Sequence, residues 1–308
     1  MESLIDRIKE HRGLLAGVFC YILWGLFPLY WKLLDDVNAF EVIAHRIIWC
    51  TVFTVLVCVL LRLDFIALLR SSRARRFLIP ASIIITANWS LYVFAVSIDM
   101  IVETAIGYYL NPRITIVLGM LVFKERLAPM QVIAIILCTI GLIFFTTNYG
   151  QFPWIAILLA LTFGVYGAIK KKGGYPAVEA IAFENIVAFL PAIAFTIFLA
   201  YYTGDHGFLG DISSWQGWQT TLLLIGGGVV TAIPLILYAA AANLIPLTIL
   251  GFLQYISPTI ALLIGVFLNN EPFTLAHGIC FGCIWTGLIL VAINSFLQSR
   301  KHQKVVRS

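Results

Sequence analysis

The stretch PWIAILLALTFGVYGAIKKK, residues 153–172, combines the two properties that decide the fold. Residues 153–169 carry no charge and are close to the length with which an α-helix crosses the hydrocarbon core of a membrane. Three consecutive lysines, Lys170, Lys171 and Lys172, end the apolar run. Because Lys and Arg accumulate in short cytoplasmic loops, the stretch predicts a membrane-spanning helix that ends at the cytoplasmic face.

Apolar runs of this kind recur along the whole chain of 308 residues. The composition is 61% hydrophobic and 11% charged, whereas a water-soluble domain contains roughly 25% charged residues. The sequence also lacks the two-residue alternation of polar and apolar positions that is typical of outer-membrane barrel strands. The composition therefore excludes a soluble enzyme and predicts an all-α integral membrane protein.

Charges, Pro-Gly clusters and polar turns divide the apolar runs into ten expected transmembrane helices. They cover residues 13–34, 39–61, 77–98, 101–123, 130–147, 153–169, 177–202, 220–242, 246–268 and 274–297. The shortest interruptions are Asp99-Met100, after the third span, and residues 243–246, after the eighth. If either interruption were helical, the count would fall to nine and the two termini would lie on opposite sides of the membrane.

The distribution of cations tests this count. With the N-terminus inside, most Lys and Arg residues fall in cytoplasmic segments, and the outer loops contain none. The longest outer loop, 203–219, carries Asp205 and Asp211 instead. The pattern predicts that both termini are cytoplasmic, with a short segment at 1–12 and a basic tail at 298–308. The net charge of +5 follows from this asymmetry, so it does not indicate nucleic-acid binding.

The two halves of the chain resemble each other at an offset of 146 residues, which places Pro258 on Pro112. The other matched pairs include Tyr92 with Tyr238, Tyr109 with Tyr255, Gly119 with Gly265, Glu125 with Glu271 and Gly141 with Gly287. The offset predicts a first five-helix repeat at 13–147 and a second at 153–297. Since five is odd, the second copy enters the membrane from the opposite side, which makes a 5+5 inverted repeat.

Inverted repeats are typical of secondary transporters, in which the two halves open one central site to each face in turn. The substrate then binds near the middle of the membrane, often against interrupted helices. Asn111-Pro112 and Ser257-Pro258 are expected to interrupt the fourth helix of each repeat. Each proline frees a backbone carbonyl that protein, water or ligand must satisfy, or it simply bends its helix.

Two arginines lie within expected spans, where an unpaired Arg costs on the order of 2.5–3.5 kcal/mol. Arg46 lies about 10 Å inside the outer end of the second helix. Its candidate partners are Glu41 and His45 on the same helix and Glu103 at a similar depth, either as a structural ion pair or as part of a substrate site. Arg113 lies close to the middle of the membrane, directly after Asn111-Pro112, and is expected to face the interior of the bundle.

Aromatic and amide side chains are concentrated on the helices that are expected to line a central cavity. Together they suit an amphipathic organic solute better than a bare ion, although some of them could serve only as core residues. The expected substrate-binding set is Trp24, His45, Arg46, Asn88, Trp89, Tyr92, Glu103, Tyr108, Asn111, Arg113, Tyr166, Tyr238, Gln254 and Tyr255.

The motifs of other chemistries are absent. The sequence has no phosphate-binding G-x-x-x-x-G-K-[ST] loop, no H-E-x-x-H and no G-x-S-x-G. Cys280 and Cys283 lie in an apolar run without a second ligand pair, which favours packing over a metal site. We therefore expect no cofactor, no metal and no catalytic residue. The groups available for proton coupling are His45, Glu103 and Glu184.

Several segments that contain polar residues within spans resemble the RarD family, in the EamA branch of the drug/metabolite transporter superfamily. They are AHRIIW at 44–49, ANWSLY at 87–92, ETAIGYYLNP at 103–112, FGVYGAIKKK at 163–172, AIPL at 232–235 and LGFLQYISP at 250–258. The resemblance implies a ten-helix inverted-repeat carrier in the bacterial cytoplasmic (inner) membrane. Arg113 replaces the apolar residue that the resemblance leads us to expect after Asn-Pro.

The leading interpretation is a secondary transporter, an exporter, that moves a small amphipathic metabolite or drug and contacts membrane lipid. One alternative is a facilitator or channel without ion coupling. Another is a membrane-embedded enzyme that acts on lipid head groups through His45, Arg46 and Glu103. The duplicated architecture favours transport, because catalysis does not require two inverted halves. The sequence does not identify the solute, the coupling ion, the direction or the oligomeric state.

Overall fold

The computed structural model describes residues 2–98, 100–147, 152–204, 207–268, 275, 278–291 and 293. Most of these residues are helical. The helices are α1 (Glu2–Trp31), the short 3-10 helix η1 (Lys32–Leu34), α2 (Ala39–Leu60), α3 (Phe65–Arg70), α4 (Ser72–Ser97), α5 (Ile101–Phe123), α6 (Pro129–Thr147), α7 (Trp154–Gly173), α8 (Ala177–Thr203), α9 (Trp215–Leu244), α10 (Leu247–Leu253) and α11 (Ile256–Leu268). A further apolar helix covers Gly278–Val291.

These helices overlap the predicted spans in position, and the count of ten membrane crossings stays a prediction. In the described part of the chain, eight helices are long and apolar enough to cross a membrane. Two shorter apolar helices, Pro129–Phe144 and Gly278–Val291, occupy the fifth and tenth predicted spans. As predicted, separate helices lie on either side of both short interruptions. α4 ends at Ser97 and α5 begins at Ile101, and α9 ends at Leu244 and α10 begins at Leu247. The end of the tenth span and the basic tail lie outside the described residues.

Polar residues between the spans begin the helices by accepting hydrogen bonds from their free N–H groups. The Asn38 side chain accepts from the Phe40 N–H at the start of α2, at 2.9 Å. Ser71 accepts from Ala74 N–H at the start of α4, and Ser214 accepts from Gly217 N–H at the start of α9. Between α5 and α6, Lys124 ends α5 in the left-handed backbone conformation.

The expected interruption of α5 at Asn111-Pro112 is wrong. The helix runs without a break from Ile101 to Phe123, because a proline removes only one hydrogen bond of the ladder and the turns on both sides stay packed. The corresponding helix of the second half does break, but at Gln254 and Tyr255, before Ser257-Pro258, so that α10 and α11 are separate helices.

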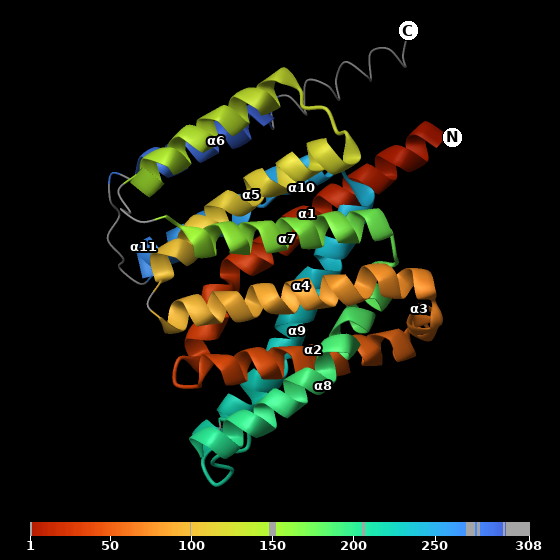
Figure 1. Ribbon diagram of the computed structural model, residues 1–308, viewed down its shortest axis with the longest axis vertical. Helices are drawn as coiled ribbons and strands as arrows, with labels where there is room; N and C mark the ends of the chain where they lie inside the picture. Colours follow the sequence, from red (N-terminus) through yellow and green to blue (C-terminus); the bar gives the residue numbers. More distant parts are fainter. Residues whose placement is uncertain are drawn as a thin grey trace.

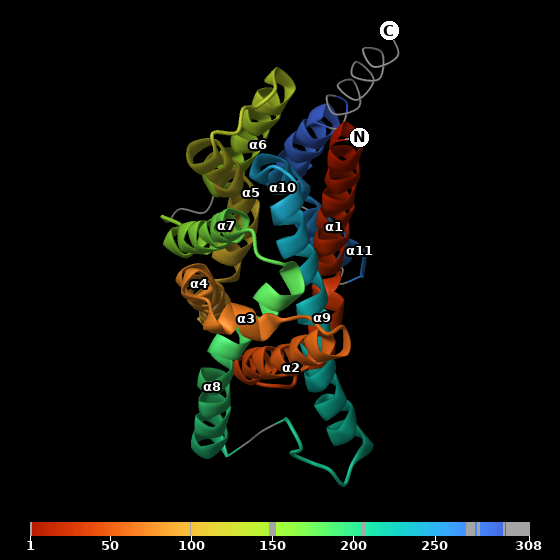
Figure 2. The ribbon, with the colours of Figure 1, turned by 90° about the vertical axis from the view of Figure 1, so that its right-hand side faces the viewer.

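The first helix of each half packs against the other half. α7 lies between α4 and α5, whereas α1 packs against α9 and α11 (Figure 1). Seen from the side, α4 to α7 lie on one side of the molecule and α1 and α9 to α11 lie on the other (Figure 2). Each side of the molecule therefore contains helices from both halves of the sequence.

Three glutamates of the first half accept hydrogen bonds from backbone N–H groups of the second half. Glu103 accepts from Ile155 at the start of α7, at 2.9 Å. The other contacts are Glu41 with the N–H groups of Gly207 and Phe208, and Glu125 with those of Leu247 and Thr248, at 2.8 to 3.0 Å. The start of α2 and the end of α5 lie at opposite ends of the bundle (Figure 1). Glutamate hydrogen bonds therefore join the two halves of the sequence at both ends of the bundle.

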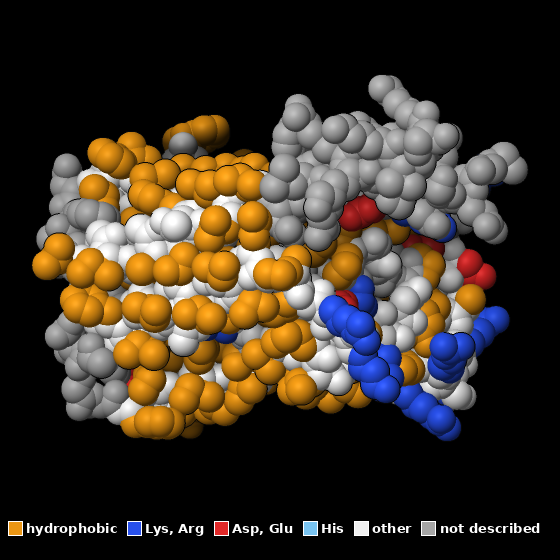
Figure 3. Space-filling model, turned by 90° about the horizontal axis from the view of Figure 1, so that it is seen from above, with side chains coloured by type: hydrophobic (Ala, Val, Ile, Leu, Met, Phe, Trp, Pro, Cys, Tyr) orange, Lys and Arg blue, Asp and Glu red, His pale blue; other side chains and the backbone are white. Residues whose placement is uncertain are grey.

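The outside of the bundle is apolar. Leu121, Leu190 and Phe267 each expose more than 70% of their surface, which favours contact with lipid over contact with water. Hydrophobic side chains cover most of the face in Figure 3, and Lys and Arg side chains gather at one end of it. The described structure is thus that of a multi-pass membrane protein.

Candidate functional site

Arg46 lies at the centre of an aromatic cage. Its guanidinium carbon is 4.5 Å from the ring centre of Trp31, 5.0 Å from that of Trp89 and 5.9 Å from that of Phe27. Its Nε donates a hydrogen bond to Thr231 Oγ1, at 3.1 Å. The cage therefore joins α1, α2 and α4 of the first half to α9 of the second half.

The expected ion pair between Arg46 and Glu103 is not formed. The carboxylate of Glu103 instead accepts from the Ile155 N–H at the start of α7. None of the ion pairs among the described residues includes Arg46. Cys50, Tyr92 and Tyr108 lie in the electrostatic neighbourhood of Arg46, and none of these groups is charged at neutral pH. Arg46 is thus a half-buried cation that aromatic rings and neutral groups surround.

Tyr92 and Tyr108 extend the cage toward α5. Their rings meet edge to face, with centroids 5.8 Å apart. Tyr108 is the eighth residue of α5, and it exposes 47% of its surface. We call Phe27, Trp31, Arg46, Trp89, Tyr92, Tyr108 and Thr231 the Arg46 site.

The sequence predicted four members of the Arg46 site, namely Arg46, Trp89, Tyr92 and Tyr108. It missed Phe27, Trp31 and Thr231. Phe27 and Trp31 are one turn apart on α1 and share a face, and this spacing of two aromatic residues beside a proline is a signal that was available. Thr231 carried no signal, because its role depends on which face of α9 meets α2.

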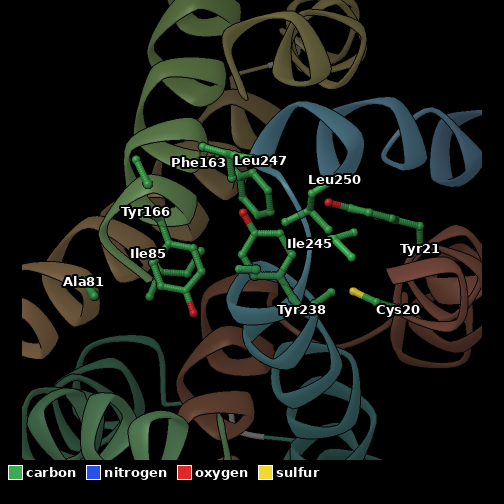
Figure 4. Packing of buried hydrophobic residues seen from close by; sticks show 13 residues of the cluster. Cys20, Tyr21, Ala81, Ile85, Phe163, Tyr166, Tyr238, Ile245, Leu247 and Leu250 are labelled. Carbon is green, nitrogen blue, oxygen red and sulfur yellow. The ribbon is translucent and has the colours of Figure 1, made fainter. Parts of the chain in front are cut away.

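A second cluster of aromatic side chains closes the bundle next to the Arg46 site. Tyr238 stacks on Tyr166, with centroids 5.8 Å apart and an angle of 12° between the rings, and both are fully buried. Trp24, Tyr21 and Phe163 surround Tyr238. Figure 4 shows Tyr238 with Tyr166, Phe163 and Tyr21 on the neighbouring helices. We call these five residues the aromatic plug. The predicted residues Trp24, Tyr166 and Tyr238 thus pack into a core.

The aromatic plug lies between the Arg46 site and the lysine-bearing end of α7. On α9, Tyr238 lies two turns beyond Thr231, and on α1 Tyr21 lies before Phe27. Beyond the plug, Lys170 donates to Glu184 Oε1 at 2.7 Å, and the Tyr166 hydroxyl donates to Glu184 Oε2 at 3.1 Å. Lys170 and Glu184 are both buried, so this ion pair forms part of the same closed region.

Arg113 lies away from the Arg46 site. Its two terminal nitrogens donate to the backbone carbonyls of Tyr109 and Cys138, and its guanidinium carbon lies 5.8 Å from the ring centre of Tyr255. The side chain is 7% exposed. Because one of these carbonyls belongs to α5 and the other to α6, Arg113 links two neighbouring helices and does not line the Arg46 site.

Two of the three predicted amide residues, Asn88 and Gln254, have local partners. The Asn88 side chain donates to the Leu159 carbonyl at 2.9 Å and to Thr162 Oγ1 at 2.7 Å, which joins α4 to α7. Gln254 accepts from Thr115 Oγ1 at 3.3 Å, which joins the α10–α11 break to α5. Asn111 is buried, and its side-chain oxygen has no hydrogen-bond partner among the described residues.

His45 lies in the second turn of α2, in contact with the α8–α9 loop. Its ring lies against Phe208, with centroids 4.5 Å apart and an angle of 31° between the rings, and its Nε2 lies 3.8 Å from Glu41. A cavity of about 160 Å³, bordered by α8, lies beside these residues. His45 therefore belongs to the contact that Glu41 makes with this loop, although it is next to Arg46 in sequence.

Comparison with known proteins identifies the family. The model of the EamA-like transporter family matches residues 11–147 and again residues 153–293. The uncharacterized transporter YojE of Bacillus subtilis is 38% identical over 291 residues, which cover 93% of this chain and 95% of that protein. Protein RarD of Streptomyces exfoliatus is 35% identical, covering 95% and 92% of the two chains, and protein RarD of Escherichia coli is 32% identical, covering 97% and 100%.

One solved crystal structure has the same fold, with a TM-score of 0.72 and 16% sequence identity over 92% of this chain and 98% of that chain. The family model covers most of the sequence, and the relatives cover it almost end to end. The names of these relatives denote transporters and RarD proteins. The chain therefore belongs to the EamA-like transporter family, and it is a membrane transporter, not an enzyme.

Proposed function

We propose that this transporter is a secondary exporter of a small amphipathic solute in the bacterial cytoplasmic membrane. It works by alternating access between two inverted five-helix halves, at 13–147 and 153–297, with both termini in the cytoplasm. The solute binds at the Arg46 site. The observation that carries the proposal is that this aromatic site joins α2 to α9, through the hydrogen bond from Arg46 to Thr231.

Three observations support the inverted repeat. The offset of 146 residues carries the start of α5 onto the start of α10, and its end onto the end of α11 within one residue. The first helix of each half packs against the third and fourth helices of the other half. The family model matches the chain twice, at 11–147 and 153–293. Two copies of one unit, packed reciprocally, are the architecture that alternating access requires.

We infer an outward-open arrangement from the position of the aromatic plug, which lies on the side of the Arg46 site that faces the lysines of α7. Tyr108 at the Arg46 site is 47% exposed, whereas Tyr238 in the aromatic plug is fully buried. The plug and the Lys170–Glu184 ion pair lie toward the end of α7 that carries three lysines, which the positive-inside rule places in the cytoplasm. In this arrangement the outside has access to the solute site, and the plug closes the inner side.

Counterflow in proteoliposomes tests the proposal. The probes are N-acetyltryptophan and its neutral amide, N-acetyltryptophanamide, because both combine an aromatic body with polar groups. We expect saturable flux of at least one probe above that of protein-free liposomes. A Tyr108→Cys variant in a Cys283→Ser background should lose this flux after an impermeant bulky thiol reagent is added outside, since the other five cysteines are buried.

Flux that persists after complete modification of Tyr108→Cys would contradict the location of the site. Flux equal to that of protein-free liposomes for both probes would contradict transport of aromatic amphipathic solutes. Collapsing the pH gradient then distinguishes a proton-coupled exporter from an uncoupled facilitator. In a proton-coupled exporter, Glu103→Gln should abolish accumulation but leave counterflow, since exchange needs no net proton movement.

A further inference from the structure

The charge of Arg46 has no counter-ion within the described protein. The other cations that the structure places inside the bundle lie beside acids or backbone carbonyls. Lys170 pairs with Glu184, and Lys171 lies 3.7 Å from Glu125 and donates to the Ile245 carbonyl. Arg46 has one hydroxyl acceptor, Thr231, and three rings. A guanidinium keeps its charge at any physiological pH, so the site itself remains positive.

The hydrogen-bonding groups of Arg46 are only partly used. Nε donates to Thr231, whereas no described residue accepts from the two terminal nitrogens. These two nitrogens form the part of the guanidinium fork that binds a carboxylate through two parallel hydrogen bonds. Donors that are kept in place and left without an acceptor inside a membrane protein indicate a ligand that supplies the acceptors.

The rings around Arg46 define the rest of the ligand. Trp31 and Trp89 lie within 5.0 Å of the guanidinium carbon, so they fix its plane and also offer flat apolar surfaces beside it. Tyr92 and Tyr108 continue this surface, and Tyr108 is half exposed. A cationic ligand would meet unscreened repulsion here, and a neutral ligand would leave the charge of Arg46 uncompensated.

We propose that the Arg46 site binds an organic anion: a carboxylate that pairs with the two terminal nitrogens of Arg46, attached to a flat apolar body that packs against Trp31, Trp89 and Tyr108. The inference rests on the proposed function only in taking this site as the transport site. Binding of the anion is a separate property, which is measured without a membrane.

Isothermal titration calorimetry on the purified protein in a neutral maltoside detergent tests the charge preference. The three probes share an indole body and differ in charge: N-acetyltryptophan is anionic, N-acetyltryptophanamide is neutral and tryptophanamide is cationic. We expect the anion to bind at least tenfold more tightly than either of the others. Equal affinity for the anion and the neutral amide, or no heat of binding with the anion at millimolar concentration, would overturn the proposal.

Variants locate the preference on one side chain. Arg46→Gln should weaken binding of the anion at least tenfold and should leave the weak binding of the amide unchanged. Arg46→Lys keeps the charge but loses the fork, so it should fall between the wild type and Arg46→Gln. Arg113→Gln is the matched control, because it removes a buried guanidinium outside the site, and its affinity for the anion should stay within twofold.

Two further measurements complete the test. Added phosphatidylglycerol should not displace the anionic probe; if it does, the anion that the site selects is a lipid head group and the carboxylate assignment is wrong.

Counterflow separates this inference from the proposed function. Binding of the anion without flux would contradict transport alone, whereas flux of the anion and the amide at equal rates, unchanged in Arg46→Gln, would contradict the anion site alone.

Discussion

Arg46 and Arg113 are both arginines within the bundle, and neither forms an ion pair with an acid in the described structure. They differ in what their terminal nitrogens contact. Those of Arg113 donate to two backbone carbonyls, whereas no described residue accepts from those of Arg46. The comparison teaches that a buried charge alone does not mark a binding site. Both terminal nitrogens of Arg113 donate to backbone carbonyls and link two helices, whereas the terminal nitrogens of Arg46 remain available to a ligand.

Lys170 is a third buried cation, and unlike the two arginines it has an acid partner, Glu184. It therefore shows how much stability a buried ion pair contributes. Glu184→Gln should destabilise the protein by about 3–5 kcal/mol, since it leaves Lys170 buried without its counter-charge. The measurement is thermal unfolding in detergent. The double variant with Lys170→Met should recover most of the loss. A double variant as unstable as Glu184→Gln alone would mean that the cost arises from lost packing and not from the uncompensated charge.

Replacing Arg113 should show its structural role. Arg113→Met removes two charge-assisted hydrogen bonds, and the relief of burying a charge offsets part of their loss, so we expect destabilisation by about 2 kcal/mol. Arg46→Met removes one hydrogen bond to a hydroxyl and should change stability by less than about 1 kcal/mol. Unfolding of the two variants in the same detergent compares them. A larger loss for Arg46→Met would reverse their assigned roles.

A double-mutant cycle tests whether Arg46 and Glu103 interact. Because Glu103 bonds to Ile155 N–H, the effects of Arg46→Met and Glu103→Gln on the free energy of unfolding should add to within about 0.5 kcal/mol. Glu103→Gln alone should cost about 1 kcal/mol, since the amide oxygen is a weaker acceptor than the carboxylate. A coupling energy well above this limit would restore the ion pair that the sequence suggested.

The smallest expected effect is that of pH on anion binding. Arg46 and a carboxylate both keep their charges between about pH 6 and pH 8, so the affinity for N-acetyltryptophan should change less than twofold across this range. Calorimetry at several pH values measures it. An imidazole titrates within this interval. A clear change in affinity would therefore indicate that His45 contributes to the site, and the same titration of a His45→Gln variant would identify it.

Much of the fold followed from hydropathy alone. The predicted fourth span, 101–123, coincides with α5, and the predicted second span differs from α2 by one residue. Charges and apolar run lengths fix where helices begin and end, because both are local properties of the chain. The expected break at Pro112 failed because a single missing hydrogen bond does not decide whether a packed helix continues.

The site was less predictable than the fold. Depth in the membrane can be counted along the sequence, but at similar depth it suggested Glu103 as the partner of Arg46, and the structure gives Arg46 aromatic neighbours instead. Which faces meet depends on contacts between distant helices, such as the insertion of α7 between α4 and α5. That arrangement gave Glu103 a partner on α7 and put Tyr166 into the aromatic plug. No local pattern in the sequence carries this information.

The three glutamates that fasten one half to the other have a kinetic consequence. Glu41 and Glu103 hold the end of the bundle where α2 and α5 begin, and Glu125 holds the opposite end. Halves that rock against each other must release one end before they open there. In the alternating-access cycle proposed above, opening one end would break the hydrogen bonds of Glu41 and Glu103, and opening the other end would break those of Glu125. The relative strength of these two sets of bonds would then decide how long the empty carrier stays in each orientation. The turnover rate would depend on these three glutamates even though none of them touches the solute.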